Sequence, residues 1–112
     1  MEQFPKAKRL QKRKDFLNVY QHGSRYSCAL FNIYLLNQNE AQGRLGISVP
    51  RRVGNAVARN RIKRAIREYF RKNSSLFSGM DVVIDVKSAS LKPFTSLTEG
   101  LEVHINKALK NI

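Results

Sequence analysis

The stretch RRVGNAVARNRIKRAIREYFRK, residues 51–72, combines a helical pattern with a high positive charge. It holds nine Lys or Arg side chains and a single acid, Glu68. At about 100° per residue, its apolar and basic side chains separate onto opposite faces of a helix. The apolar face consists of Ala58, Ile62, Ala65, Ile66 and Tyr69, and the basic face of Lys63, Arg64, Arg67 and Arg71, with Arg59 and Arg61 on the flanks beside Asn60.

This basic face indicates a negatively charged partner. Like charges one turn apart each destabilise a helix by about a few tenths of a kcal/mol unless something negative lies against them. A guanidinium group also binds phosphate through two hydrogen bonds and stacks on bases, which a lysine ammonium cannot do. Gly54 is expected to allow a tight turn before the helix, whose N-terminal amides can face an anion. The stretch therefore predicts a helix that binds a phosphate backbone.

Length and composition fit one small nucleic-acid-binding domain over residues 1–112. The formal charge of +13 and the pI near 10.5 indicate either a nucleic acid or an anionic membrane surface. A helix lying on a membrane would expose large apolar side chains, whereas this helix needs them for the core. No apolar run approaches 18 residues, so no membrane partner is expected. The single cysteine, Cys28, forms no internal disulfide, and a reducing, cytoplasmic location is predicted.

The flanking sequence predicts an α+β fold. Residues 1–14 carry six basic side chains and one acid, so residues 1–13 are expected to form a basic, flexible arm. Polar residues 38–43 have the composition of a hairpin loop between two strands. Ser96 and Glu99 match the capping box of a last helix. The expected elements are a helix over 15–21 ended by a left-handed Gly23, strands over 29–37, 44–49 and 81–86, and a helix from about residue 96.

Aromatic side chains favour single-stranded nucleic acid. Phe16, Tyr20, Phe31 and Tyr34 lie early in the chain, and strand alternation places Phe31 on the face opposite Tyr34. Exposed aromatics beside cations stack on unpaired bases. No zinc-finger spacing, heptad zipper or helix-turn-helix pair indicates a duplex DNA reader. For each of the four, a core position remains an equally good interpretation.

No catalytic or metal site is expected within the chain. Asp81 and Asp85 are the only acids that pair, and two pleats of a strand separate them by roughly 13 Å. A two-metal site instead requires metals about 3.5–4 Å apart. His22, expected at a helix end, and His104, expected at the surface, form no nucleophilic constellation with Cys28 or a serine.

The basic stretch and its surroundings resemble the bacterial ribonuclease P protein component. Gly-Asn-Ala-Val running into Arg-Asn-Arg-x-Lys-Arg carries the resemblance, together with RLQKRKDFLNVYQHG (9–23) and the strand FNIYLL (31–36). The resemblance covers roughly residues 9 to 110. It implies a two-layer α/β sandwich whose mixed sheet contains a left-handed βαβ crossover, similar to a ribosomal-protein domain fold.

The resemblance also implies a function. The chain would bind ribonuclease P RNA and the single-stranded 5′ leader of precursor tRNA, with no obligate protein partner. The RNA subunit, with bound Mg²⁺, would cleave, and the protein would supply neither a catalytic group nor a metal ligand. A ribosomal or other structural RNA-binding protein, and an autonomous metal-dependent nuclease, are the alternatives. The resemblance assigns Arg52, Asn55, Arg59, Asn60, Arg61, Lys63, Arg64 and Arg67 to RNA binding, and Phe16, Tyr20 and Tyr34 to a leader cleft between the first helix, the sheet and the basic helix.

Overall fold

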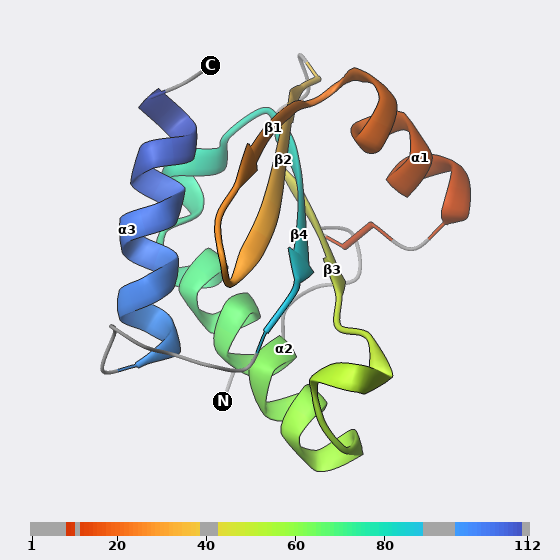
Figure 1. The fold of residues 1–112 in the computed structure, drawn as a ribbon. Coiled ribbons are helices and arrows are strands. Elements are labelled where there is room, and N and C mark those ends of the chain that lie inside the picture. The colour runs from red at the N-terminus through yellow and green to blue at the C-terminus, as the bar shows by residue number, and fades with distance from the viewer. Residues whose placement is uncertain (1–8, 11, 39–42, 89–95, 111–112) are drawn as a thin grey trace.

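Helices cover a central sheet on both faces in the computed structural model, which describes residues 9–10, 12–38, 43–88 and 96–110 (Figure 1). Two of the helical elements, η2 and η3, are short 3-10 turns. In chain order the elements are α1 (Arg13–His22), β1 (Ser24–Ser27), β2 (Phe31–Asn37), β3 (Arg44–Ser48), η2 (Arg51–Val53), α2 (Ala56–Lys72), η3 (Ser74–Phe77), β4 (Met80–Val86) and α3 (Leu97–Lys110).

The described strands form one mixed sheet in the order β1-β2-β4-β3. β2 pairs antiparallel with β1 and with β4, whereas β3 pairs parallel with β4. Because β4 lies between β2 and β3, the hairpin predicted across residues 38–43 is wrong. A polar loop containing glycine marks a change of direction, but it does not say which strand will lie alongside. The predicted α+β class and the mixed sheet are confirmed, and β3, α2 and β4 form the expected βαβ unit.

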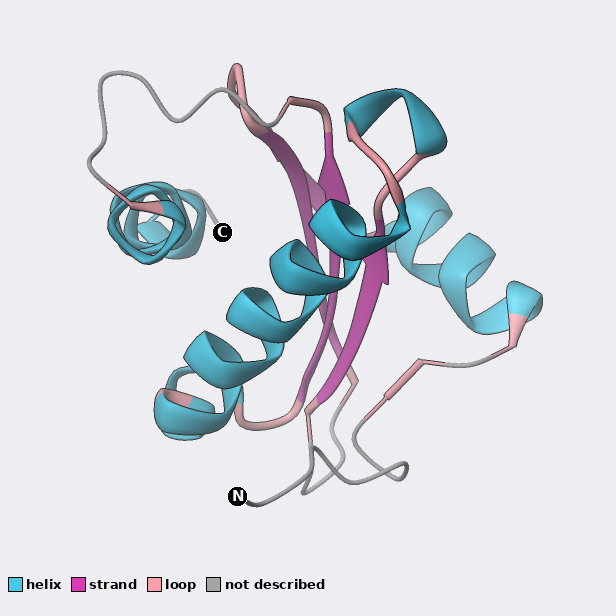
Figure 2. Ribbon diagram, turned by 90° about the horizontal axis from the view of Figure 1, so that it is seen from below, coloured by secondary structure: helices cyan, strands magenta, loops and turns pink. Residues whose placement is uncertain are grey.

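The two faces of the sheet are covered differently. α2 and α3 pack on one face and α1 on the other, as two perpendicular views show (Figures 1 and 2). The α2 and α3 face contains the main core, in which Phe31, Ile33 and Ile84 are fully buried. The α1 face has a smaller cluster of Leu10, Val19 and Val83. Strand alternation sends successive residues of one strand into these two environments.

The predicted apolar stripe of α2 is confirmed. Ile66 and Tyr69 are buried in the main core, and Ile62 packs against it. Phe70 extends the stripe and stacks on Phe77 of η3, with ring centroids 4.1 Å apart. α3 begins as expected, since the Ser96 hydroxyl accepts a hydrogen bond from the backbone N–H of Glu99.

α1 is longer than predicted, and the reason for its glycine stop differs. Gly23 has φ −80°, which is not left-handed. A Cβ there would lie 2.6 Å from the Val19 carbonyl oxygen and 3.1 Å from that of Leu35. The residue is therefore glycine because the end of α1 approaches β2 closely.

Two elements lie outside the sequence-based expectations. β1 was not predicted, because SRYS is short and its side chains are mostly exposed. Before α1, Leu10 is buried, and its N–H donates to the Leu45 carbonyl oxygen on β3. Of the arm predicted over residues 1–13, the structure describes residues 9, 10, 12 and 13, and Arg13 already belongs to α1; the rest of the arm lies outside the described residues.

Candidate nucleic-acid interface

The cations of α2 and η2 lie away from the main core. Arg61 and Arg64 are exposed on α2, and Arg52 is exposed on η2. Arg59, Lys63 and Arg67 are half-buried beside them. In the part of the chain that the structure describes, none of these six side chains pairs with an acid. They therefore form an uncompensated positive surface, which we call the cation ridge.

The C-terminal end of α2 differs, because its cations are neutralised locally. Glu68 accepts two hydrogen bonds from Arg71, at 2.6 and 3.2 Å, and lies 3.7 Å from the Lys72 ammonium. The Arg71 contact lowers the pKa of Glu68. Arg71 was predicted on the basic face, and its ion pair places it at the boundary of the cation ridge. The cations of this region that have no acidic partner in the described chain therefore lie in η2 and in α2 before Glu68.

Local hydrogen bonds fix the start of α2. The Asn55 side-chain oxygen accepts from the Ala58 N–H at 2.8 Å, so Asn55 caps the helix. The Arg59 Nε donates to the Gly54 carbonyl oxygen at 3.1 Å. The chain turns tightly before the helix through η2, which the Gly54 N–H closes by donating to the Arg51 carbonyl oxygen at 3.2 Å, whereas Gly54 itself is extended, with φ 169°. Two residues assigned to RNA binding thus also hold the helix terminus that presents their neighbours.

The ridge continues toward the N-terminal segment beside β3. Burial and the nearby positive charge of Arg9 lower the pKa of Arg67. Arg9 bridges to Leu45 of β3, at the open edge of the sheet. Two guanidinium groups therefore lie near each other where α2 passes the sheet edge, an arrangement that an anion stabilises.

The three aromatic residues expected to bind the leader lie on the α1 face. Tyr20 and Tyr34 meet edge to face, with ring centroids 4.8 Å apart, and Phe16 lies 6.5 Å from Tyr20. All three are partly buried around the small cluster, whereas Phe31 is fully buried in the main core. The structure thus brings Phe16, Tyr20 and Tyr34 together, on a surface that we call the aromatic face, and separates Phe31 from them.

A glycine on β3 allows Phe16 to lie against the sheet. A Cβ at Gly46 would come within 2.6 Å of the Phe16 ring. Gly46 follows Tyr34 and Val83 in a row across the strands. The ring therefore packs directly on the backbone of β3, which limits its orientations.

An ion pair connects α1 to the sheet. The buried Asp81 carboxylate accepts from the Arg44 Nε at 3.0 Å and its Nη2 at 2.7 Å, and from Gln38 at 3.0 Å. The Arg44 guanidinium also lies 3.7 Å from Asp15 on α1. Asp85 instead accepts from the Tyr20 hydroxyl at 2.7 Å, so the two acids are engaged separately. The described residues contain no group of three His, Cys, Asp or Glu that could hold a metal.

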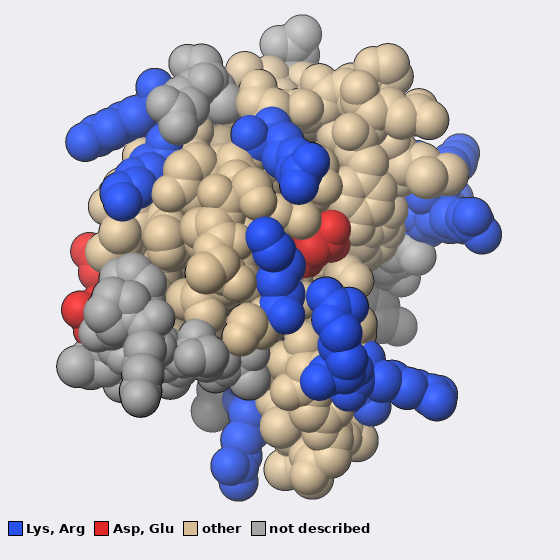
Figure 3. Space-filling model, in the orientation of Figure 1, with Lys and Arg blue, Asp and Glu red and all other residues tan. Residues whose placement is uncertain are grey.

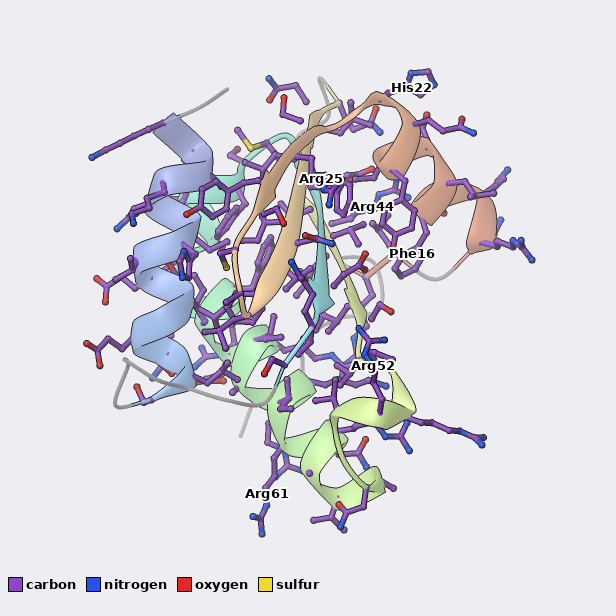
Figure 4. The ribbon with its side chains drawn as sticks, in the orientation of Figure 1. Phe16, His22, Arg25, Arg44, Arg52 and Arg61 are labelled. Atoms are coloured by element: carbon purple, nitrogen blue, oxygen red, sulfur yellow. The ribbon has the colours of Figure 1, made fainter. Side chains whose placement is uncertain are left out.

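The aromatic face and the bulk of the cation ridge lie on opposite faces of the sheet. Figure 4 shows Phe16 and Arg25 on the α1 side, Arg52 beyond the end of β3, and Arg61 pointing away from the sheet. Figure 3 shows Lys and Arg side chains around the rim and across the middle of the face in view, where they lie beside a small acidic area. One ligand contacting both surfaces would have to pass the β3 edge, where η2 and Arg52 lie.

Sequence reasoning did not find Arg25 and Arg44. Arg25 lies opposite Tyr34 in the strand register, beside the aromatic residues. Three of the four residues of SRYS are exposed, so the stretch carries no alternation that could have indicated it. Arg44 was included in a strand, but its ion pair with Asp81 depends on the parallel pairing of β3 and β4.

Among the described residues, no helix is both long and apolar enough to cross a lipid bilayer. The two histidines also lie apart from the aromatic face. His22 is exposed at the end of α1. His104 is hydrogen-bonded to the Tyr26 hydroxyl at 3.1 Å, and burial lowers its pKa.

Comparison with known proteins supports the assignment of these surfaces to one family. The family model described as Ribonuclease P matches residues 4–111. The ribonuclease P protein component of Syntrophus aciditrophicus is 39% identical over 109 residues, covering 96% of this chain and 92% of the relative. That of Staphylococcus haemolyticus is 37% identical and covers 94% and 92%.

Solved structures show the same fold. The Staphylococcus aureus RNase P protein matches with a TM-score of 0.77 at 36% identity, covering 95% of both chains. The Thermotoga maritima RNase P protein matches with a TM-score of 0.68 at 30% identity, covering 93% of this chain and 96% of its own. A sheet with a cationic crossover helix on one face and clustered aromatics on the other, together with these matches, shows that the chain belongs to the ribonuclease P protein component family.

Proposed function

We propose that this chain serves ribonuclease P as an RNA-binding, non-catalytic subunit. The cation ridge binds the catalytic RNA, and the aromatic face holds the single-stranded 5′ leader of precursor tRNA. Phosphodiester cleavage then takes place on the RNA subunit, with Mg²⁺ held mainly by RNA. The holoenzyme matures the 5′ end of tRNA in the cytoplasm.

The separation of charge on α2 carries this proposal. One face of the helix is buried in the main core, while Arg61 and Arg64 on the other are exposed and have no acidic partner in the described chain. When RNA phosphates bind these arginines, the counterions condensed on the RNA are released and the repulsion between the arginines is relieved. A helix that was only a solvent-facing structural element would gain nothing from this arrangement.

The aromatic face supports leader binding. Base stacking on an aromatic side chain contributes about 1–3 kcal/mol per base and tolerates any sequence. Phe16 and Tyr20 on α1 and Tyr34 on β2 provide partly exposed rings that pack together against the sheet. Precursor and mature tRNA differ in the leader, so these contacts favour substrate over product.

The two surfaces together would place the leader beside the catalytic RNA. Both are polyanions, and fixed cations between them lower their repulsion. The Mg²⁺ concentration that the holoenzyme needs for cleavage should therefore fall, because less of the RNA charge has to be screened by Mg²⁺. The protein therefore acts by positioning and electrostatics, and none of its carboxylates need bind the metal.

Reconstitution tests the proposal. The protein is mixed with ribonuclease P RNA and precursor tRNA at low Mg²⁺ and physiological salt, and cleavage at the mature 5′ end is measured. We expect the protein to stimulate cleavage, and Arg61→Ala combined with Arg64→Ala to remove most of that stimulation.

A matched control changes the same charge on α3. Lys107→Ala combined with Lys110→Ala removes two exposed cations from the C-terminal end of α3 and should retain stimulation. Absence of any effect of the unmodified protein would contradict the proposal. Cleavage by protein without RNA would instead indicate an autonomous nuclease.

A further inference from the structure

A polar row crosses the sheet next to the aromatic row on the α1 face. Asn32 on β2, Asp85 on β4 and Ser48 on β3 are register partners, and Ser27 on β1 extends the row. Neighbouring residues on the same strands, Tyr34, Val83 and Gly46, form the row beneath Phe16. A base stacked on the aromatic residues would therefore have its edge near polar side chains.

Asp85 is the acid of this row, and Tyr20 holds it in place. The Tyr20 hydroxyl donates to the Asp85 Oδ1 at 2.7 Å. In the described part of the chain, this is the only hydrogen bond of the Asp85 side chain. Its other oxygen, Oδ2, therefore has no donor there. Arg25 acts on the carboxylate through its charge without a hydrogen bond.

The pKa shifts of Tyr20 and Asp85 agree with a protonated hydroxyl that holds the carboxylate in place as a hydrogen-bond acceptor. Burial and the Asp85 carboxylate raise the pKa of Tyr20 far above its ordinary value, so the hydroxyl keeps its proton and donates it to Asp85. Burial raises the pKa of Asp85, while the bond from Tyr20 opposes that rise. The hydroxyl oxygen of Tyr20 remains available as a second acceptor beside the carboxylate.

A half-buried carboxylate is costly on a surface that binds RNA. It repels phosphates, and burial of a charge without full hydrogen bonding is unfavourable. An apolar residue would cover the sheet equally well without either cost. The carboxylate becomes favourable only when a ligand supplies hydrogen-bond donors at that position.

We propose that Asp85 and Tyr20 form an acceptor site that reads the edge of one leader nucleobase and favours bases with amino groups over uracil. This inference rests on the proposed leader binding. Guanine presents two adjacent donors, N1–H and the N2 amino group, to the two acceptors. Cytosine and adenine present one amino group each. Uracil presents an imino donor flanked by two carbonyl oxygens, which the carboxylate repels. The expected order is guanine first, then cytosine and adenine, then uracil.

A metal ion is a less suitable occupant of this site. Mg²⁺ prefers several oxygen ligands in octahedral geometry, and the other members of the row, Asn32 and Ser48, carry no charge. The Asn32 side-chain oxygen already accepts from Ser27 at 2.6 Å. A nucleobase edge needs only the acceptors that the site provides.

The experiment measures holoenzyme affinity for precursor tRNAs that have an oligouridine leader with one substituted position. Guanosine, adenosine or cytidine is placed in turn at each of the leader positions closest to the mature end. At one position we expect guanosine to bind about tenfold more tightly than uridine. Asp85→Asn, whose amide can present a donor to uracil, should reduce that ratio to within about twofold. Tyr20→Phe keeps the ring and frees Oδ1, so the carboxylate retains two acceptors and guanosine should stay preferred, but less strongly because Asp85 is no longer held in place.

Controls separate this inference from the proposed function. Glu102→Gln makes the same change of charge on α3 and should leave the base order unchanged. An unchanged order in Asp85→Asn, or a change in Mg²⁺ dependence without a change in base order, would overturn the acceptor site while leader binding stands. Equal affinity of the unmodified holoenzyme for precursor and mature tRNA would overturn the proposed function itself.

Discussion

The two faces of the sheet are built from alternate residues of the same strands, yet they have opposite properties. On the α2 and α3 face, sixteen buried residues of the described chain form one continuous apolar core. On the α1 face, Leu10, Val19 and Val83 are the buried members of the corresponding cluster among the residues that the structure describes, and aromatic and polar side chains surround them. The comparison indicates that one face stabilises the fold and leaves the other available to bind a ligand.

The largest expected effect is a loss of stability from a substitution on the α2 and α3 face. Ile84→Ala empties a fully buried position in the main core and should lower the free energy of unfolding by about 2–5 kcal/mol. The neighbouring Val83→Ala, on the α1 face, removes fewer buried carbons into a smaller cluster and should cost less. Urea denaturation of both variants measures the difference. Equal losses would contradict the distinction between the two faces.

The ion pair beneath α1 should give the next largest effect. Arg44→Ala leaves the buried Asp81 carboxylate with Gln38 as its only side-chain donor among the described residues, and we expect the free energy of unfolding to fall by about 3 kcal/mol. Arg51→Ala, an exposed cation on η2, should cost less than about 0.5 kcal/mol. Thermal and chemical unfolding compare them. Similar stability of the two variants would show that the pair does not hold α1 to the sheet.

A smaller effect is expected from single cations of the ridge. If about six phosphates are engaged, affinity for ribonuclease P RNA should fall with salt at a log–log slope of roughly −4 to −5. Arg64→Ala should make that slope shallower by roughly 0.7 to 0.9. Lys110→Ala on α3 should leave it unchanged. A slope unaffected by Arg64→Ala would exclude Arg64 from phosphate contact.

The smallest effect concerns pH, and its sign differs between two acids. The raised pKa of Asp85 means that its charged form destabilises the fold. This cost develops as pH rises from the ordinary pKa of 3.8 through the higher pKa of the folded protein. The lowered pKa of Glu68 means that its pairing with Arg71 stabilises the fold above the ordinary 4.5 and is lost as pH falls through the folded value.

Urea midpoints of two variants test these signs across the acid range. Relative to the unmodified protein, Asp85→Asn should gain stability as pH rises through the raised pKa of Asp85. Glu68→Gln should lose stability relative to the unmodified protein as pH rises through the lowered pKa of Glu68. The same sign of change for both variants would contradict the assigned environments.

Much of the fold was predictable because local patterns carry it. The apolar stripe of α2, ending in Ile66 and Tyr69, and the Ser96 cap of α3 follow from spacing within one segment. The insertion of β4 between β2 and β3 depends on pairing between distant segments, which periodicity does not encode. β1 was missed because a four-residue exposed strand has almost no pattern.

The candidate site shows the same limit. Strand alternation showed that only one of Phe31 and Tyr34 could lie with Phe16 and Tyr20, and the family resemblance, not the pattern, selected Tyr34. The position of the cation ridge on the opposite face of the sheet could not be predicted, since it depends on the crossover of α2. Asp85 was assigned no role from the sequence, because its bond to Tyr20 joins residues 65 positions apart.

The ratio of holoenzyme affinities for precursor and mature tRNA tests the central claim most directly. Phe16→Ala is compared with Leu17→Ala, a neighbouring exposed residue of the same helix. The account predicts that Phe16→Ala weakens binding of the precursor by about tenfold, within the range of one lost base stack, and leaves mature tRNA unaffected. Leu17→Ala should change neither affinity. Equal loss for both tRNAs in Phe16→Ala would contradict a leader-binding face.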